Sequence, residues 1–231
     1  ITATADYVKA KRRSKKTMQL SFDEWNVWAN RNAQFETWDY AEPRLEQIYN
    51  LSDALAFGGL ICSLLNHADR VKMACLAQLV NAIAPILTQP GGPVIKQTIF
   101  YPFQQVSTYG RGEVLKPILS CPKYGSKVYG EVPVLQTAIV HNQEAGEVSV
   151  FILNCDQGEE VELALDFRSF AAVTPLEHVV LNGSDLEAVN SFAEPEKVKP
   201  GKLEISRDKA NQLTVVLPKL SWNMIRFAIN K

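Results

Sequence analysis

The sequence predicts an α/β part in residues 1–111 followed by an all-β part in residues 112–231. In the first part, short apolar runs are followed by longer helical patterns, an order typical of parallel sheets. From Gly112 onward, short alternating runs recur between turn-forming residues, which is typical of a β-sandwich. With 231 residues, of which 46% are hydrophobic and 21% charged, the chain can bury a sizeable core.

The first strand is predicted at about residues 18–25, after a polar segment, residues 1–17, that we expect to be a helix or a loop. Alternation places Glu24 at the C-terminal end of this strand, on the face that carries Met18, Leu20 and Phe22. In α/β folds the C-terminal ends of strands point toward the loops that form the ligand cleft. Glu24 is therefore a candidate catalytic residue.

Further elements of the α/β part follow in order. Residues 29–43, which include Trp38 and Tyr40, are predicted to form a long loop that shapes a substrate cleft. Apolar spacing predicts one or two helices over residues 44–66, in which the Gly58-Gly59 pair permits close packing against a neighbour. The elements expected next are a buried strand at residues 71–77 that ends at Gln78, a loop at 88–93 and a helix at 95–109 interrupted at Pro102.

The all-β part is predicted from short alternating runs separated by turn sequences such as Asp156-Gln157-Gly158. We expect it to form a β-sandwich of the jelly-roll-like type, with a domain boundary near residue 111. The predicted strands are residues 132–140, 147–153, 161–166, 174–181, 213–217 and 222–229.

The number of strand-helix units indicates that the α/β part is incomplete. The α/β part supplies two units, whereas a closed (β/α)8 barrel needs eight and about 250 residues. Two parallel strands alone would leave bare edges and a half-covered apolar face. We therefore expect the chain to be the C-terminal part of a longer protein, comprising the last two barrel units and the sandwich. Its expected partners are the missing N-terminal part of the barrel and further copies in a homo-oligomer.

Several blocks of sequence carry a resemblance to a known family. They are the run Asp23-Glu24-Trp25-Asn26-Val27-Trp28 and, in the same order along the chain, residues 45–50, 67–71, 76–86 and 97–103. These blocks resemble the α-L-arabinofuranosidases of glycoside hydrolase family 51, densely over residues 18–112 and elsewhere only in general character. The resemblance implies a (β/α)8 barrel with an appended β-sandwich, in which Glu24 is the catalytic nucleophile on the seventh strand and Gln78 binds substrate.

The implied chemistry requires two carboxyl groups. A retaining glycosidase holds them about 5 Å apart, so that one attacks the anomeric carbon and the other protonates the leaving oxygen. Asp23 is unsuited as the partner of Glu24, because neighbouring side chains in a strand point to opposite faces. The resemblance implies that the acid/base glutamate lies on the fourth barrel strand, before residue 1. It further implies that the complete enzyme hydrolyses terminal α-L-arabinofuranosyl residues of arabinan or arabinoxylan, and that this chain alone is inactive.

Two other side chains are candidates for contact with a sugar. Trp28 lies just past the strand end, where an indole ring can stack on sugar C–H groups, although Trp25 and Trp28 could equally be core residues. Gln78 offers both a donor and an acceptor to sugar hydroxyls. Asn26 and Asn81 are weaker candidates for sugar contact, and we expect them instead to orient the backbone. The alternative for Glu24 is a surface salt bridge.

Other functional classes are not favoured by the sequence. His67, with Asp69 and Arg70, precedes the second strand, at the barrel end associated with stability rather than catalysis. The four cysteines form no C-x-x-C pair, and paired-carboxylate hydrolysis needs no metal, so no metal and no cofactor are expected. A net charge of −1 disfavours nucleic acid as a partner, and the apolar stretch 51–65 is too short to cross a membrane. Widely spaced, free cysteines slightly favour the cytoplasm over secretion or the periplasm.

Two alternatives to arabinofuranosidase activity stay open from the sequence. One is a non-catalytic carbohydrate-binding or structural module derived from a glycosidase. The other is the endoglucanase or xylanase activity of related barrel glycosidases.

Overall fold

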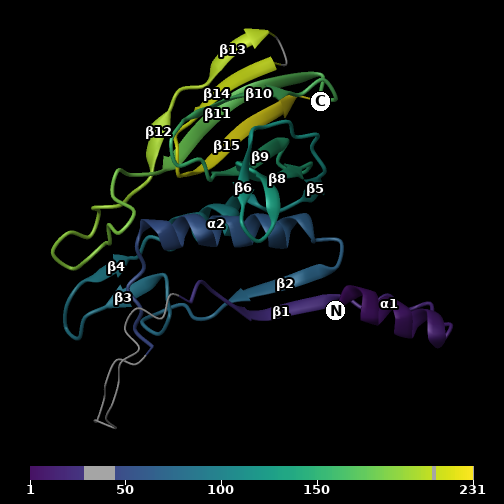
Figure 1. Ribbon diagram of the computed structural model, residues 1–231, viewed down its shortest axis with the longest axis horizontal. Coiled ribbons are helices and arrows are strands. Elements are labelled where there is room, and N and C mark those ends of the chain that lie inside the picture. Colours follow the sequence, from purple (N-terminus) through teal and green to yellow (C-terminus); the bar gives the residue numbers. More distant parts are fainter. Residues whose placement is uncertain (29–44, 210–211, 231) are drawn as a thin grey trace.

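The computed structural model describes residues 1–28, 45–209 and 212–230, and it stacks their secondary structure in four layers (Figure 1). The layers are a parallel pair of strands, a helical layer, a six-stranded sheet and a three-stranded sheet. The predicted loop at residues 29–43, with Trp38 and Tyr40, lies outside the described residues. The all-β prediction for the second part of the chain is confirmed, and the sandwich covers the helical layer.

The parallel pair consists of β1 (Leu20–Trp25) and β2 (Val71–Leu76), so both predicted strands are present. The burial predicted for the second strand was wrong for this chain, because four of the six residues of β2 are exposed. Helix α2 (Leu51–Asn66) forms the crossover that a parallel pair requires. The prediction of helix from residue 44 was wrong over residues 45–50. Asn50 ends the preceding extended segment, because its side chain accepts a hydrogen bond from Asp53 N at 3.0 Å while the Asp53 carboxylate accepts one from Asn50 N at 2.9 Å.

The predicted helix at residues 95–109 also begins later than expected. Residues Ile86–Thr88 (β3) and Val94–Lys96 (β4) form a short hairpin, and α3 runs from Phe100 to Tyr109. Pro102 therefore lies in the first turn of α3. Backbone N–H groups in a first turn have no acceptor within the helix, so the absence of one in proline breaks no helical hydrogen bond. The predicted interruption at Pro102 was consequently wrong.

The sandwich contains a six-stranded sheet in the order β12-β11-β15-β9-β8-β5 and a three-stranded sheet in the order β10-β14-β13. A separate hairpin, β6–β7, stands beside them. Five of the six predicted strands are present as single strands, and the predicted strand 132–140 is divided between the end of β7 and β8. The strands are β5 (Glu113–Leu115), β6 (Lys123–Ser126), β7 (Gly130–Pro133), β8 (Leu135–Asn142), β9 (Glu147–Asn154), β10 (Val161–Asp166), β11 (Ala172–Leu181), β12 (Gly201–Leu203), β13 (Ser206–Lys209), β14 (Gln212–Leu217) and β15 (Ser221–Asn230).

The six-stranded sheet is buried on both faces. Along β9, Val150 and Ile152 pack in the core between the two sheets, whereas Phe151 and Leu153 pack toward the helices. Strand β15 alternates in the same way, with Trp222 toward the helices and Ile225 toward the three-stranded sheet. Burial on both sides explains why these strands are more continuously apolar than a half-exposed strand.

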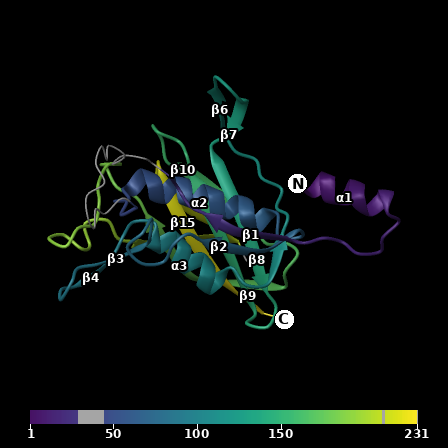
Figure 2. The same cartoon turned by 90° about the horizontal axis from the view of Figure 1, so that it is seen from below.

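Helix α2 lies between the parallel pair and the six-stranded sheet, as two views at right angles show (Figures 1 and 2). On one side, the ring of Phe57 stacks on Trp25 of β1 at a centroid distance of 4.7 Å. On the other side, a Cβ atom added to Gly58 would lie 2.4 Å from Cε3 of Trp222. That distance leaves no room for a side chain, so the close packing predicted for the Gly58-Gly59 pair is confirmed.

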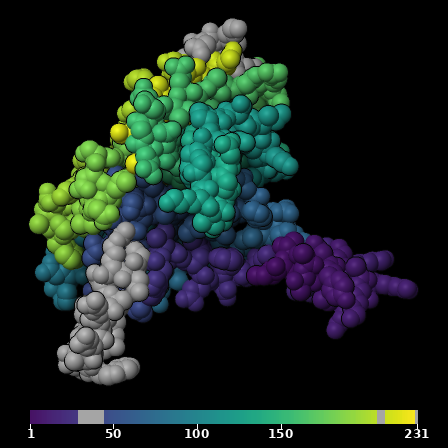
Figure 3. Space-filling view, viewed as in Figure 1, coloured from purple at the N-terminus to yellow at the C-terminus, as the bar shows by residue number. Residues whose placement is uncertain are grey.

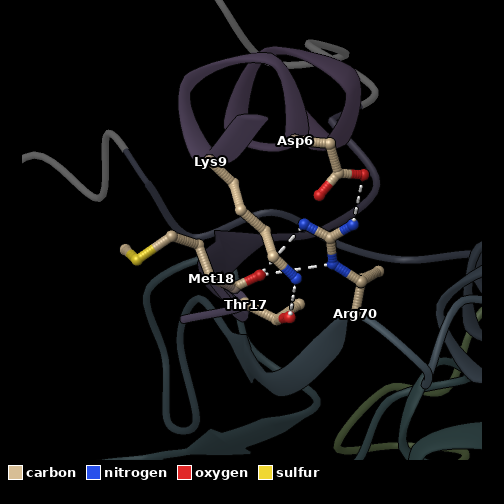
Figure 4. A network of polar contacts seen from close by, with 5 residues as sticks. All are labelled: Asp6, Lys9, Thr17, Met18 and Arg70. Atoms are coloured by element: carbon tan, nitrogen blue, oxygen red, sulfur yellow. Dashed lines mark hydrogen bonds and ion pairs between the residues drawn. The ribbon is translucent and has the colours of Figure 1, made fainter. Parts of the chain in front are cut away.

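A polar network fixes the N-terminal ends of β1 and β2 (Figure 4). Arg70 donates to Met18 O through Nε and Nη2 at 3.2 and 3.1 Å, and its Nη1 lies 2.8 Å from Asp6 Oδ2. The hydrogen bond from Arg70 lowers the pKa of Asp6. Asp6 belongs to α1 (Thr2–Lys11), which has no buried residue and stands out from the body of the molecule (Figure 3). The network thus attaches an exposed helix to the strand pair.

A buried histidine predicts acid sensitivity of the sandwich. His178 is 1% exposed, its Nε2 lies 2.9 Å from Asn223 Oδ1, and burial lowers its pKa below 6.5. Below pH 6.5 the unfolded chain binds a proton that folded His178 resists, so the free energy of unfolding falls as pH falls. We expect His178→Gln to reduce this slope, by up to about 1.4 kcal/mol per pH unit, in urea unfolding between pH 7 and pH 5. His141→Gln, on β8, is the control, and equal slopes for the wild type and His178→Gln would contradict the assignment.

Within the described residues, no helix combines the length and the apolar character that crossing a membrane requires.

Candidate active site

Glu24 and Gln78 lie at the same edge of the parallel pair. Trp25 pairs with Leu76, so Glu24 stands one residue before this pair on β1, and Gln78 follows it by two residues, beyond the end of β2. The strands run in the same direction, and Arg70 directly precedes β2, so this edge is the one opposite the Arg70 network. Both side chains are exposed. The structure therefore brings together the two residues that the sequence suggested from separate strands.

The pairing of β1 with β2 is irregular at Glu24. Phe22 pairs with Ala74 and Trp25 pairs with Leu76, so three steps along β1 match two along β2. This register shift interrupts the strict alternation that the sequence predicted for Phe22 and Glu24. A bulge of this kind re-aims side chains and is common beside active sites.

Glu24 is exposed, and it makes no ion pair with another residue in the described part of the chain. The alternative of a surface salt bridge therefore has no support from the described residues. Phe22 and Met73, which are 44% and 57% exposed, place apolar surface on the same strand pair. Its exposure leaves the Glu24 carboxylate available to an external ligand.

The two tryptophans of this region have different environments. Trp25 is partly buried and joins the core through its stacking on Phe57. Trp28 lies three residues beyond the end of β1 and is 56% exposed. Of the two, Trp28 alone is free to contact a ligand, since the indole of Trp25 already packs against α2.

The loop after β2 is bound to the end of β1 by Asn26. Its Nδ2 donates to Ala77 O at 2.8 Å and to Ile83 O at 2.5 Å. Farther along the loop, the Asn81 side chain accepts a hydrogen bond from Thr88 N at 2.8 Å. The prediction that Asn26 and Asn81 orient the backbone is confirmed.

His67 has a structural role, as the sequence predicted. It caps the C-terminus of α2, and its Nδ1 lies 2.7 Å from Ser63 O. Arg70 is engaged by Met18 O and Asp6 at the edge of the pair opposite to Glu24. These residues do not form a second site with Glu24.

Comparison with known proteins identifies the family. The family model described as the α-L-arabinofuranosidase C-terminal domain matches residues 23–221, most of the chain. The chain belongs to this family. The resemblance to glycoside hydrolase family 51 noted in the sequence is thereby confirmed.

Relatives of this α-L-arabinofuranosidase C-terminal part include two enzymes with related names. The intracellular exo-α-(1→5)-L-arabinofuranosidase of Halalkalibacterium halodurans is 52% identical over 229 residues, which are 98% of this chain and 45% of the relative. Intracellular exo-α-(1→5)-L-arabinofuranosidase 1 of Bacillus subtilis is 46% identical with the same coverage. The chain thus spans a little under half the length of these relatives.

A solved structure extends the comparison to the fold. A family 51 α-L-arabinofuranosidase from Bifidobacterium longum superposes with a TM-score of 0.90 at 33% identity, over 98% of this chain and 45% of that one. The fold of this arabinofuranosidase C-terminal part, including its β-sandwich, is therefore that of the family.

Two features of the site had no signal in the sequence. The register shift between Phe22 and Trp25 depends on pairing with β2, which alternation within one strand does not reveal. The carbonyl of Ile83 is an acceptor for Asn26 only because the loop folds back, and any residue at position 83 presents the same carbonyl. Both features are properties of the backbone.

Proposed function

We propose that this chain supplies the nucleophile and part of the sugar-binding surface of a retaining α-L-arabinofuranosidase. The observation that carries the proposal is the placement of Glu24 and Gln78, both exposed, at one edge of a parallel strand pair in a chain of this family. That edge is where α/β enzymes position their catalytic residues.

In the proposed reaction, the Glu24 carboxylate attacks the anomeric carbon of a terminal arabinofuranosyl group. The bond to the leaving oxygen breaks, and a covalent glycosyl-enzyme ester forms, which water then hydrolyses with net retention. Gln78 donates and accepts hydrogen bonds with sugar hydroxyls, and Trp28 stacks on the sugar. The acid that protonates the leaving oxygen comes from the part of the enzyme outside this chain. No metal or cofactor takes part in this scheme.

The proposed architecture is the last two units of a (β/α)8 barrel in residues 1–111, followed by the sandwich domain in residues 112–231. The β1–α2–β2 crossover supports it, because such a unit is the repeating element of a barrel. The exposed side chains of Phe22 and Met73 support it as well, since strands of a complete barrel bury such surface. We propose that the preceding strands of the longer protein cover this face.

The names of the relatives suggest the substrate. They describe exo-acting enzymes for α-(1→5)-linked arabinofuranosyl groups, and they describe these enzymes as intracellular. We propose that the complete enzyme removes terminal, non-reducing α-L-arabinofuranosyl residues from oligosaccharides of arabinan or arabinoxylan in the cytoplasm. We further propose that it works as a homo-oligomer.

A panel of aryl glycosides tests the proposed function. The complete enzyme is expected to hydrolyse an aryl α-L-arabinofuranoside and to leave aryl β-xylosides and β-glucosides intact, and NMR of the first product should show retained anomeric configuration. Preferred hydrolysis of the xyloside or glucoside would instead assign the activity of the related barrel glycosidases. Sugar binding without hydrolysis of any member would assign a non-catalytic carbohydrate-binding module.

A further inference from the structure

The peptide group between Ala77 and Gln78 is held on both of its polar atoms. Its carbonyl, Ala77 O, accepts a hydrogen bond from Asn26 Nδ2 at 2.8 Å. Its N–H, on Gln78, donates to Ile83 O at 3.2 Å. Ile83 O also accepts from Asn26 Nδ2, at 2.5 Å. Asn26 is therefore linked to both ends of the peptide that carries Gln78.

Asn26 is itself fixed to the end of β1. It follows Trp25, the last residue of the strand, and lies two residues after Glu24. Its Oδ1 accepts a hydrogen bond from Val27 N at 2.8 Å, which sets the orientation of the amide. The Asn26 amide thus holds the loop after β2 in a fixed position relative to the end of β1.

We propose that Asn26 is a positioning residue that sets Gln78 relative to Glu24. The inference rests on the proposed function, since it assumes that Glu24 and Gln78 contact the same sugar. Apart from Asn26, the described hydrogen bond between the two strand ends at this point runs from Ala77 N to Trp25 O at 3.1 Å. That bond fixes the start of the loop. Without Asn26, however, Ala77 O and Ile83 O would lose the donor that they share.

The chemistry of the site requires an amide at position 26. One side-chain nitrogen must donate to two carbonyl oxygens while the side-chain oxygen accepts from an N–H, and asparagine meets all three needs. Asn26→Asp keeps the acceptor for Val27 N but places a carboxylate oxygen against Ala77 O and Ile83 O. The loop carrying Gln78 should then move away from β1.

A double-mutant cycle in the complete enzyme tests the inference. Asn26→Asp is expected to lower kcat/KM for an aryl α-L-arabinofuranoside by about 10²-fold, the scale of a misplaced binding group. Gln78→Ala should have a similar effect, and the double variant should be no more than about twofold worse than Gln78→Ala, because Asn26 acts through Gln78. Multiplicative losses in the double variant would overturn the inference, since they mean that Asn26 acts independently of Gln78.

Asn190 offers a matched control. Its Nδ2 donates to Lys96 O and Val198 O, both at 2.9 Å, and its Oδ1 accepts from Val198 N at 2.7 Å, so it makes the same three bonds away from the strand ends. Asn190→Asp should lower the melting temperature as Asn26→Asp does, but its kcat/KM should stay within about twofold of the wild-type value. An equal loss of kcat/KM in both variants would overturn the inference. If Asn26→Asp does not fold, Asn26→Ser, which retains one donor without a charge, takes its place in the cycle. Full activity of Glu24→Gln would refute the proposed function, whatever the result of the cycle.

Discussion

Glu24→Gln in the complete enzyme is expected to lower kcat for an aryl α-L-arabinofuranoside by about 10⁴-fold or more, the scale seen when other covalent catalysts lose their nucleophile. The amide is nearly isosteric with the carboxylate, but it is a far weaker nucleophile and does not form the glycosyl ester. Steady-state release of the aryl alcohol measures the effect, and circular dichroism checks that the fold is retained. Since Glu24 is exposed, its replacement disturbs little packing.

Two controls separate loss of the nucleophile from a general effect on the site. Asp23→Asn removes the neighbouring carboxylate and is expected to cost less than about tenfold, because Asp23 is not assigned to the chemistry. Glu24→Ala with added azide should regain part of the rate and give a glycosyl azide of inverted configuration, since the small anion enters the space that the carboxylate leaves. Near-normal hydrolysis by Glu24→Gln would show that another residue attacks the sugar.

The second large effect is expected from recombining the two parts of the enzyme. This chain alone should not hydrolyse the aryl arabinofuranoside, and adding the separately expressed N-terminal part should restore activity. The physical reasons are the acid catalyst, which we assign to the missing part, and the exposed apolar side chains of Phe22 and Met73, which association would bury. Size-exclusion chromatography measures the complex, and release of the aryl alcohol measures turnover.

The Glu24→Gln chain serves as the control in this mixture. It should form the same complex and remain inactive, which attributes the recovered activity to this chain's own carboxylate. A complex that forms with the unmodified chain but shows no hydrolysis would favour a structural or binding role for the chain.

Much of the sandwich was predictable because its main strands are long and strongly patterned. Strands such as β9 and β15 are eight and ten residues long, are mostly apolar and are preceded by turn-forming residues. The short strands β4 and β12 have three residues each, too few for a period to be recognised. The start of α2 was misplaced because Leu45, Ile48 and Tyr49 have helical spacing, whereas the Asn50 cap decides where the helix begins.

The candidate site was predictable only in part. Strand-end positions and the family resemblance pointed to Glu24 and Gln78, and the parallel pairing of β1 with β2 brings them to one edge. The sequence left Trp25 and Trp28 equivalent, and the position of Phe57 on α2 distinguishes them. Local patterns carry no information on that contact, because it joins residues more than thirty positions apart.

The packing of α2 limits how the α/β part and the sandwich can be separated or exchanged. The helix meets β1 through Phe57, and it meets β15 at Gly58, where an added Cβ would lie 2.4 Å from Cε3 of Trp222. An unrelated sandwich fused behind the same helix would have to match this close contact. Cutting the chain near residue 111 would expose both Gly58 and Trp222 to solvent. The two parts are thus expected to depend on each other for stability, and a truncation between α3 and β5 is expected to destabilise both.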